Sequence, residues 1–442
     1  MSPDERQAIS AERSPWLRGT LRVPGDAILT HLAVLTAAIA RGETVIAGAL
    51  DTAATAATVQ AVRALGAWCE RGETGTLRVH GLGVGGLLAP TDTIKLGDSV
   101  VSVTLAMGLA GACDFRSRFT AEPEVAARGY GPLLDGLKRL GSTIESSDRG
   151  RLPVTLHGPD IVLPAELALP AGAPATKAAL LLAALNARWP TVLVEPEPTW
   201  NHAERLLRRL GARVEVTEQE QGGRRIEIGG LPELRAQPIE MPADPSLAAL
   251  GVTAATIVPG SEITIGGVLL NPARTAILSA LMAMGASIEI HRLRNDGEEE
   301  VGDLVVRTTA LRAAALAAQH VAPLVDDLPL LAVAAAFAEG ESVFYLPPGL
   351  PLLEHARLAA LSQALSANGI RNHVTEEVVA VAGGRTVHGG ARLELDDAGV
   401  ALAMLILGMG TQHRVTLSDR SVIEDRFSGF VAAFEAIGAG FG

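Results

Sequence analysis

The 442-residue sequence predicts an α/β fold made of six repeats in two groups of three. Three observations lead to this prediction. One helix pattern ends at a glycine, a second helix pattern is apolar throughout, and a Pro-Gly-Asp or Pro-Ala-Asp turn occurs twice. Both helix patterns alternate with short β-branched segments, which is typical of α/β proteins.

The first pattern is a charged helix that ends at an apolar residue followed by glycine. Glycine suits the left-handed residue that follows many helices. Because these helices carry Arg, Lys and Glu, we expect them to lie on the outside. The glycines are separated by 75, 70, 74, 84 and 69 residues and are Gly66, Gly141, Gly211, Gly285, Gly369 and Gly438.

The second pattern is a helix rich in Ala and Leu, followed by a polar turn and a β-branched strand. These helices are apolar nearly all round, so we expect them to be buried. Each repeat then holds one inner helix, one outer helix and several strands. The copies span residues 30–48, 102–121, 176–195, 246–266, 329–346 and 399–417.

The repeated turns indicate where the chain crosses between two domains. Pro24 and Pro242 are 218 residues apart, close to half the chain, and each precedes an inner helix. We predict one domain over 26–241, a second over 1–25 plus 242–442, and a ligand cleft between them. The alternative is that both turns are ordinary strand-to-helix connections within one domain.

Composition excludes several classes of function. The charge sum is 37 − 49 = −12, and only 14 residues are aromatic (4 Trp, 2 Tyr, 8 Phe), so we expect no nucleic-acid partner. The longest apolar runs are about a dozen residues, too short to span a membrane. Cys69 and Cys113 have no metal-ligand spacing, which agrees with a cytoplasmic location. We expect residues 1–14 to be a short flexible leader.

Inner helices that begin at a cleft would aim their N-termini at it. Each N-terminus carries roughly half a positive charge and free N–H groups, which favours anionic ligands. An acidic protein would then still bind phosphate or carboxylate groups. The alternative is that Asp and Ser side chains simply cap these helices.

Six segments of the sequence resemble EPSP synthases, the 3-phosphoshikimate 1-carboxyvinyltransferases, closest to their bacterial class II form. The resemblance runs from about Trp16 to Gly438 and is carried by LRGTLRVPGD, GETVIAGAL, RLPVTLHGP, VEPEPTWNHAERLL, VPGSEITIGGVLLNPARTAILSALMAMGASIEI and DDLPLLAVAAAFAEG. It implies a two-domain inside-out α/β barrel of six βαβαββ-type units. The implied reaction moves the carboxyvinyl group of phosphoenolpyruvate to the 5-hydroxyl of shikimate 3-phosphate. It needs no metal and no cofactor, but it needs cations and a general acid and base.

At many site positions the residue in this sequence differs from the one in the family pattern. Its Ser-Ala-Gln-Val-Lys-Ser stretch is here Ala173 to Ala178, and its first-helix serine is Ile28. A hydrogen bond to a charged group is worth about 1.5–3 kcal/mol, so the loss of several cations predicts a large loss of affinity. The positions that hold a basic residue in the family are here Ala27, Leu32, Thr104, Trp200, Leu353 and Gly399.

Other positions keep the family residue. The resemblance implies that Asp326 handles the hydroxyl's proton, that Glu354 is an acid/base, and that Arg357 and Arg128 bind phosphoenolpyruvate. Ser246 keeps its place after the second crossover. There are structural alternatives: Asp326 caps a helix, Glu354 and Arg357 pair on one helix face, and Arg128 is a solvated surface residue. For His202 and Glu204 we expect a local cap on an outer helix.

From these replacements we predict a paralogue that keeps the fold and has lost carboxyvinyl transfer, but still binds a small carboxylate. Trp200 would offer a flat surface to a hydrophobic or unphosphorylated ring. In a competing interpretation Trp200 fills the space and the arginines pair with Asp326 and Glu354. Two other functions stay open: an active carboxyvinyltransferase of the shikimate pathway, and a scaffold or regulatory subunit. The sequence identifies no protein partner.

Overall fold

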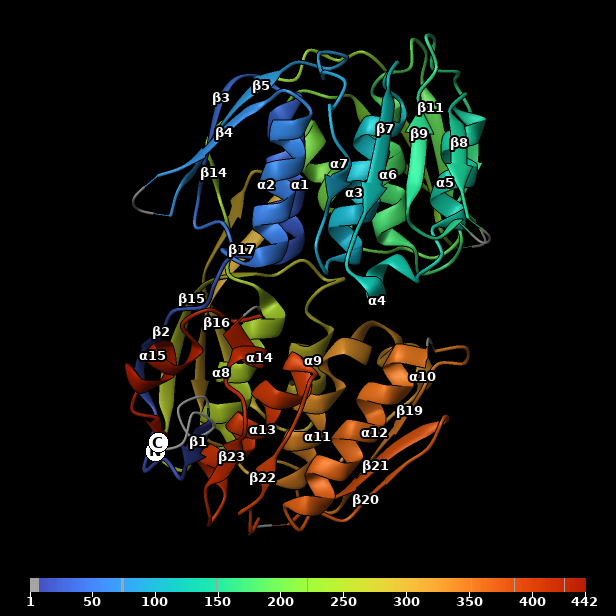
Figure 1. Cartoon of the computed structure of the whole chain (residues 1–442). Helices are drawn as coiled ribbons and strands as arrows, with labels where there is room; N and C mark the ends of the chain where they lie inside the picture. The colour runs from blue at the N-terminus through green and yellow to red at the C-terminus, as the bar shows by residue number, and fades with distance from the viewer. Residues whose placement is uncertain are drawn as a thin grey trace. The chain divides into compact units, whose positions relative to one another are not determined.

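The computed structural model describes residues 8–72, 75–147, 150–220, 222–350, 352–384, 386–424 and 426–442. Within these residues the strands form six sheets of four strands each, with helices packed against them (Figure 1). The predicted α/β fold with six repeats is confirmed. No helix in these ranges combines the length and the hydropathy that crossing a membrane requires.

One repeat shows the plan of all six. Its short first strand pairs in parallel with the second, and the last strand in sequence lies antiparallel between the second and the third. In order, its elements are β6 (Ile94–Lys95), α3 (Val100–Gly111), β7 (Arg116–Thr120), α4 (Pro123–Ala126), α5 (Gly131–Arg139), β8 (Thr143–Ser146) and β9 (Val154–His157).

By contacts the chain divides into two compact units. The central unit holds 25–241 and 295–299, and the discontinuous unit holds the described residues of 8–24, 242–294 and 300–442. The central unit's other elements are α1 (Ala27–Ala38), β3 (Arg41–Ala47), α2 (Ala53–Ala64), β4 (Trp68–Arg71), β5 (Leu77–Leu82), β10 (Glu166–Ala168), α6 (Pro174–Ala184), β11 (Thr191–Glu195), α7 (His202–Arg209), β12 (Val214–Glu218), β13 (Arg224–Ile228) and β14 (Ile239–Glu240).

The discontinuous unit repeats the same plan three times. Its elements are β1 (Ile9–Glu12), β2 (Arg18–Leu21), α8 (Pro245–Ile257), β15 (Glu262–Leu269), α9 (Ala276–Ala283), β16 (Ser287–Asp296), β17 (Glu299–Arg307), β18 (Ala315–Leu316), α10 (Ala318–Val321), η3 (Ala322–Asp327), α11 (Leu328–Ala336), β19 (Glu341–Tyr345), α12 (Leu352–Ala367), β20 (Asn372–Val374), β21 (Val378–Ala382), β22 (Arg392–Leu393), α13 (Ala398–Gly410), β23 (Val415–Leu417), α14 (Ser421–Glu424), α15 (Phe430–Glu435) and β24 (Gly440–Phe441).

Strands distant in sequence complete the first, fourth and sixth sheets. β14 pairs in parallel with β3, and β2 pairs in parallel with β15. β1 lies antiparallel between β23 and β24. In Figure 1 the blue strands β1 and β2 accordingly lie beside red and olive elements of the discontinuous unit. The prediction of a flexible leader over residues 1–14 is wrong for Ile9–Glu12, which pair on both edges; residues 1–7 lie outside the described part.

The inner helices form the cores, as predicted. In α13 every residue from Val400 to Met409 is buried, and α3 is buried from Ser102 to Gly111. A Cβ at Gly108 would overlap the backbone of Ala179, so glycine allows α3 and α6 to approach closely. The glycines predicted to end the outer helices all have positive φ, between 78° and 108°: Gly66, Gly141, Gly211, Gly285, Gly369 and Gly438.

Candidate functional site

The starts of α8, α11 and α13 are linked by polar side chains in the discontinuous unit. Asp244 caps α8 by accepting from the Ser246 backbone N–H at 2.8 Å, and Asp397 caps α13 by accepting from the Val400 N–H at 2.9 Å. The Ser246 hydroxyl donates to Asp327, at the start of α11, over 3.3 Å. The Ser246 bond thus links the starts of α8 and α11, and Arg357 connects the start of α13 through Asp397. Each of these helix N-termini favours negative charge.

Arg357 on α12 is the central cation of this cluster. Its Nε donates to Asp397 Oδ2 at 2.7 Å, and its Nη1 donates to Asp326 Oδ1 at 2.6 Å and to Glu354 Oε2 at 2.8 Å. Burial lowers the pKa of Arg357, but the carboxylates around it outweigh burial and raise it. Among the described residues Nη2 has no hydrogen-bond partner, so one edge of the guanidinium is left for a ligand.

The carboxylates around Arg357 differ in exposure. The side chain of Asp326 is 73% exposed, whereas that of Glu354 is 12% exposed. The alternative that Asp326 caps α11 is wrong, because Asp327 occupies the cap position and makes no side-chain cap bond. The i, i+3 pair of Glu354 and Arg357 is present. The side chain of Leu353, where the resemblance leads us to expect a lost basic residue, lies outside the described residues.

Asp327 lies in the most acidic part of the cluster. Burial raises its pKa to about 6, and the nearby Asp244 and Asp326 act in the same direction. The hydrogen bond from Ser246 and the charge of Arg426 oppose this rise. The family resemblance points to Asp326, whereas the carboxylate that accepts from the Ser246 hydroxyl is its neighbour, Asp327.

The central unit has a different chemistry at the starts of its inner helices. His31 on α1 is buried and shares a 2.8 Å hydrogen bond between its Nδ1 and the Thr58 hydroxyl. Thr58 is in turn 2.7 Å from the Ser102 hydroxyl of α3. Burial lowers the pKa of His31 to about 4, although Asp26 acts against it. This chain of hydrogen bonds is therefore neutral.

Several positions expected to line the site pack against the core of the central unit. Leu32 is fully buried, and Trp200 is only 8% exposed. The hydroxyl of Thr104 donates to the Val100 carbonyl within its own helix. Of the expected apolar lining, Ile28 and Ala175 are partly buried against the same core. These residues lie near the starts of helices, but their side chains are wholly or partly buried and leave little surface for a ligand to contact.

Lys177 of α6 is completely buried between two carboxylates. Its Nζ lies 3.0 Å from Glu195 and 2.9 Å from Glu204, whose side chains are 3% and 2% exposed. The prediction of a local cap by His202 and Glu204 is wrong: Glu204 pairs with Lys177, and His202 contacts Glu299. Their buried positions could not be inferred from a charged helix start alone.

The predicted site residues thus fall into two sets. Asp326, Glu354 and Arg357 meet in one cluster, and Ser246 joins it through Asp327. Arg128 and Trp200 belong to the central unit. Arg128 is partly buried and has no ion pair within the described ranges. Arg357 therefore has the partners that the collapsed-site interpretation predicts, but Arg128 does not.

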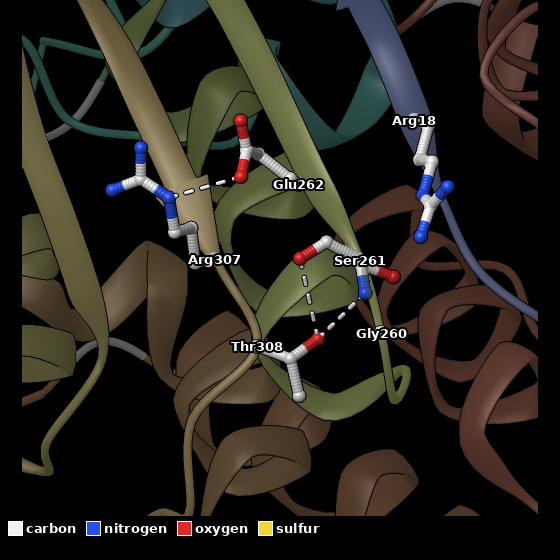
Figure 2. A pocket seen from close by; sticks show the side chains of 6 residues that line it. All are labelled: Arg18, Gly260, Ser261, Glu262, Arg307 and Thr308. Carbon is white, nitrogen blue, oxygen red and sulfur yellow. Dashed lines mark hydrogen bonds and ion pairs between the residues drawn. The ribbon is translucent and has the colours of Figure 1, made fainter.

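A separate surface pocket of about 700 Å³ lies on the sheet of the fourth repeat. It is lined by Arg18, Gly260, Ser261, Glu262, Arg307 and Thr308, none of which is a predicted site residue (Figure 2). Figure 2 shows Glu262 turned towards Arg307, to which it is paired at 3.0 Å. Arg307 also pairs with Glu289, so its charge is already balanced by neighbouring carboxylates. In the described part of the chain no group of His, Cys, Asp and Glu is suited to a metal ion.

Comparisons with known proteins agree on one family. The sequence model of EPSP synthase (3-phosphoshikimate 1-carboxyvinyltransferase) matches residues 12–434. A 3-phosphoshikimate 1-carboxyvinyltransferase of Parvibaculum lavamentivorans is 38% identical, covering 100% of this chain and 98% of the relative. One of Acidiphilium cryptum is 39% identical, covering 96% of this chain and 95% of the relative.

Solved structures confirm the predicted enolpyruvyltransferase-like fold. EPSP synthase from Acinetobacter baumannii has a TM-score of 0.88 at 28% identity, covering 99% of this chain and 100% of that one. The enolpyruvyl transferase NikO from Streptomyces tendae has a TM-score of 0.75 at 20% identity and covers 99% of this chain and 98% of that one, a likeness of fold.

These relatives overturn one prediction. The expectation that the chain has lost carboxyvinyl transfer is wrong, because relatives 37–39% identical over nearly the full length have that activity as their name. That expectation counted lost cations position by position. It judged the charge of the helix N-termini too weak to replace those cations, and it could not foresee that Arg357 has no hydrogen bond at Nη2 within the described residues.

Proposed function

The chain belongs to the EPSP synthase family, and we propose that it is an active 3-phosphoshikimate 1-carboxyvinyltransferase of the shikimate pathway. The reaction would transfer the carboxyvinyl group of phosphoenolpyruvate to the 5-hydroxyl of shikimate 3-phosphate. The observation that carries this proposal is the full-length similarity to relatives with that name. The Arg357 cluster supports it, since a carboxylate substrate needs a fixed cation.

Arg357 is the group we assign to the substrate carboxylate. Asp397 and Glu354 hold its Nε and Nη1, which fixes the direction of the guanidinium fork. Asp326 is the most exposed of the three carboxylates on Arg357, and solvent weakens its ion pair relative to the better-buried ones. A substrate carboxylate could therefore bind at Nη2 and compete with Asp326 at little cost.

Proton transfer is assigned to two carboxylates of the same cluster. The attacking hydroxyl must lose a proton, and the vinyl carbon must gain one and later release it. Asp326 is exposed and carries the free carboxylate surface that a base for the hydroxyl needs. Glu354 is mostly buried beside Arg357 and is the second acid/base group.

The remaining binding residues come from the resemblance. Ser246, Arg128 and Trp200 are proposed to contact the substrates, with Trp200 contributing only its exposed edge. The chain is proposed to act like the bacterial class II form, without the cations that the family pattern has where Ala27, Leu32 and Gly399 stand here. We also propose a cytoplasmic location, in which the free thiols of Cys69 and Cys113 remain reduced.

Phosphate release tests the proposal directly. Purified protein is mixed with phosphoenolpyruvate and shikimate 3-phosphate, and inorganic phosphate and the carboxyvinyl product are measured. We expect turnover that requires both substrates and falls in Arg357→Ala. Arg420→Ala is the matched control, because Arg420 pairs with Glu424 on the surface. Absence of product at saturating substrate would overturn the proposal.

A further inference from the structure

The tip of the β16–β17 hairpin, residues 295–299, belongs to the central unit. The remainder of both strands belongs to the discontinuous unit. We call Asp296, Glu298 and Glu299 the acidic tip. It binds one face of α7, where the basic residues are spaced three, three and one residues apart: His202, Arg205, Arg208 and Arg209.

Each member of the acidic tip pairs with α7, and Glu299 lies near two of its residues, His202 and, at 3.6 Å, Arg205. Asp296 pairs with Arg209 at 3.2 Å, and Glu298 pairs with Arg208 at 2.5 Å. Glu299 accepts from His202 Nδ1 at 2.7 Å. The first two pairs are partly exposed, but the side chains of His202 and Glu299 are 0% and 8% exposed. Of these contacts, the hydrogen bond between Glu299 and His202 is therefore the most buried.

The backbone of the tip is constrained by the same helix. Gly297 has a φ of 57°, and a Cβ there would overlap the Arg209 side chain. Glu298 has a φ of 76°, which is unusual for a residue with a side chain. Arg205 donates to the Glu298 carbonyl, and Arg208 binds its carboxylate. Glu298 is thus held in an unusual backbone conformation by contacts to both its carbonyl and its side chain. This indicates that α7 fixes the position of the acidic tip.

The buried end of this contact leads to a predicted site residue. The ring of His202 is stacked on Trp200, with centroids 5.3 Å apart and planes at 25°. His202 Nε2 is buried without a hydrogen-bond partner in the described ranges, so Nδ1 is the one ring nitrogen that is held. Without Glu299 no hydrogen bond would fix the rotation of this ring, and the Trp200 indole would lose a fixed stacking surface.

We infer that Glu299 is a positioning residue: by holding His202 it fixes the orientation of Trp200 at the start of α7. The inference rests on the proposed function in assigning Trp200 to the substrate site. It adds that substrate binding depends on a carboxylate delivered by the β16–β17 hairpin, 97 residues further along the chain than His202.

Tryptophan fluorescence tests the positioning without any need for activity. Trp16, Trp68 and Trp189 are 51%, 47% and 56% exposed, whereas Trp200 is 8% exposed. Replacement of the three exposed residues by Phe leaves Trp200 as the sole reporter. In that background we expect Glu299→Ala to raise acrylamide quenching severalfold and to shift emission to the red. Quenching equal to that of the parent would overturn the inference.

A neighbouring acidic residue provides the matched control. Glu300 follows Glu299 in β17 and is exposed, because successive strand residues point to opposite faces. We expect Glu300→Ala to leave Trp200 emission and quenching unchanged. Glu299→Gln keeps an oxygen that can accept from Nδ1 and should restore protection. Equal quenching in Glu300→Ala and Glu299→Ala would show a general loosening of the hairpin and would overturn a specific role.

Kinetics then separate this inference from the proposed function. We expect Glu299→Ala to raise KM for shikimate 3-phosphate severalfold while kcat changes less, and Glu299→Gln to restore KM. If the parent protein shows no turnover, the proposed function fails and quenching alone decides the positioning. If Glu299→Ala does not fold, Glu299→Asp, which withdraws the carboxylate from Nδ1, takes its place in both measurements. An unchanged KM beside increased quenching would overturn the link to substrate.

Discussion

The starts of the inner helices differ between the two units, although all six repeats share one plan. In the discontinuous unit they carry charge: Arg357 lies among Asp326, Glu354 and Asp397 and is itself 15% exposed. In the central unit they carry the neutral chain of His31, Thr58 and Ser102. There the lysine of an inner helix, Lys177, is enclosed in the interior.

This comparison shows that the burial of a cation, more than its presence, decides whether it can bind a ligand. Lys177 and Arg357 each have carboxylate neighbours within 3.0 Å. Lys177 is fully enclosed, so its charge serves only to balance Glu195 and Glu204. Within the described residues Arg357 makes no hydrogen bond at Nη2, so this edge of its guanidinium could accept an anion. One cation therefore has a structural environment, and the other is the one we propose as a binding group.

The largest effect is expected from breaking the buried cluster of the central unit. Lys177→Met leaves two buried carboxylates without a cation, which should lower the free energy of unfolding by about 3–5 kcal/mol. Urea denaturation measures this loss. Lys138→Met is the control, since Lys138 is 57% exposed in its pair with Asp135 and should cost at most about 1 kcal/mol.

A combined variant tests whether unpaired buried charge causes this loss of stability. When Lys177→Met is combined with Glu195→Gln and Glu204→Gln, none of these three positions carries a charge, and much of the stability should return. If Lys177→Met alone proved as stable as the parent, the cluster would not be the structural group described above.

The second prediction concerns pH and the neutral chain of the central unit. Because the folded pKa of His31 is lowered from 6.5 to about 4, the unfolded chain binds this proton first as the pH falls. The stabilisation is complete above pH 6.5 and is lost towards pH 4, by about 3 kcal/mol. His31→Gln should lack this part of the pH dependence when unfolding is measured between pH 7 and 4. An identical slope in the variant would contradict a neutral, buried His31.

The third prediction concerns the binding cation of the discontinuous unit. Arg357→Ala removes a charged hydrogen bond to the substrate carboxylate, worth about 1.5–3 kcal/mol, so kcat/KM for phosphoenolpyruvate should fall by about 10- to 100-fold. Arg357→Lys keeps the charge but loses the planar fork, and it should recover little of the loss. Steady-state kinetics measure both, with Arg420→Ala as control. Full activity in Arg357→Ala would remove Arg357 from the site.

The smallest effect is expected from Asp327, and its sign is opposite to that of His31. Its folded pKa is raised from 3.8 to about 6, so its stabilisation is present below pH 3.8 and is lost as the pH rises through 6. Asp327→Asn cannot ionise. Relative to the parent, it should therefore gain about 1–2 kcal/mol between pH 4 and 7, reduced by the partial exposure of the site. Urea unfolding at pH 4 and pH 7 measures this gain. If Asp327→Asn shows no gain relative to the parent, the pKa of Asp327 is not raised.

The features predicted correctly from the sequence are those set by residues close together in the chain. The helix-ending glycines follow from local backbone sterics, and all six have positive φ. The burial of α13 follows from a run of apolar residues that leaves no polar face. The pair of Glu354 and Arg357 needs only a spacing of three residues on one helix. Such features depend on short-range geometry that a pattern of residues expresses directly.

The tertiary structure decided which charges are enclosed and which are left open. Lys177 meets Glu204, Arg357 meets Asp397 and His202 meets Glu299 only after distant segments pack together. Nor does an apolar residue by itself reveal its surroundings: Leu32, which we expected at the site, is fully buried within the core. The physical reason is that the energy of a charge depends on its burial and its partners. Burial and partners are set by long-range packing, so the sequence determined the repeats and their helices while the folded chain determined the site.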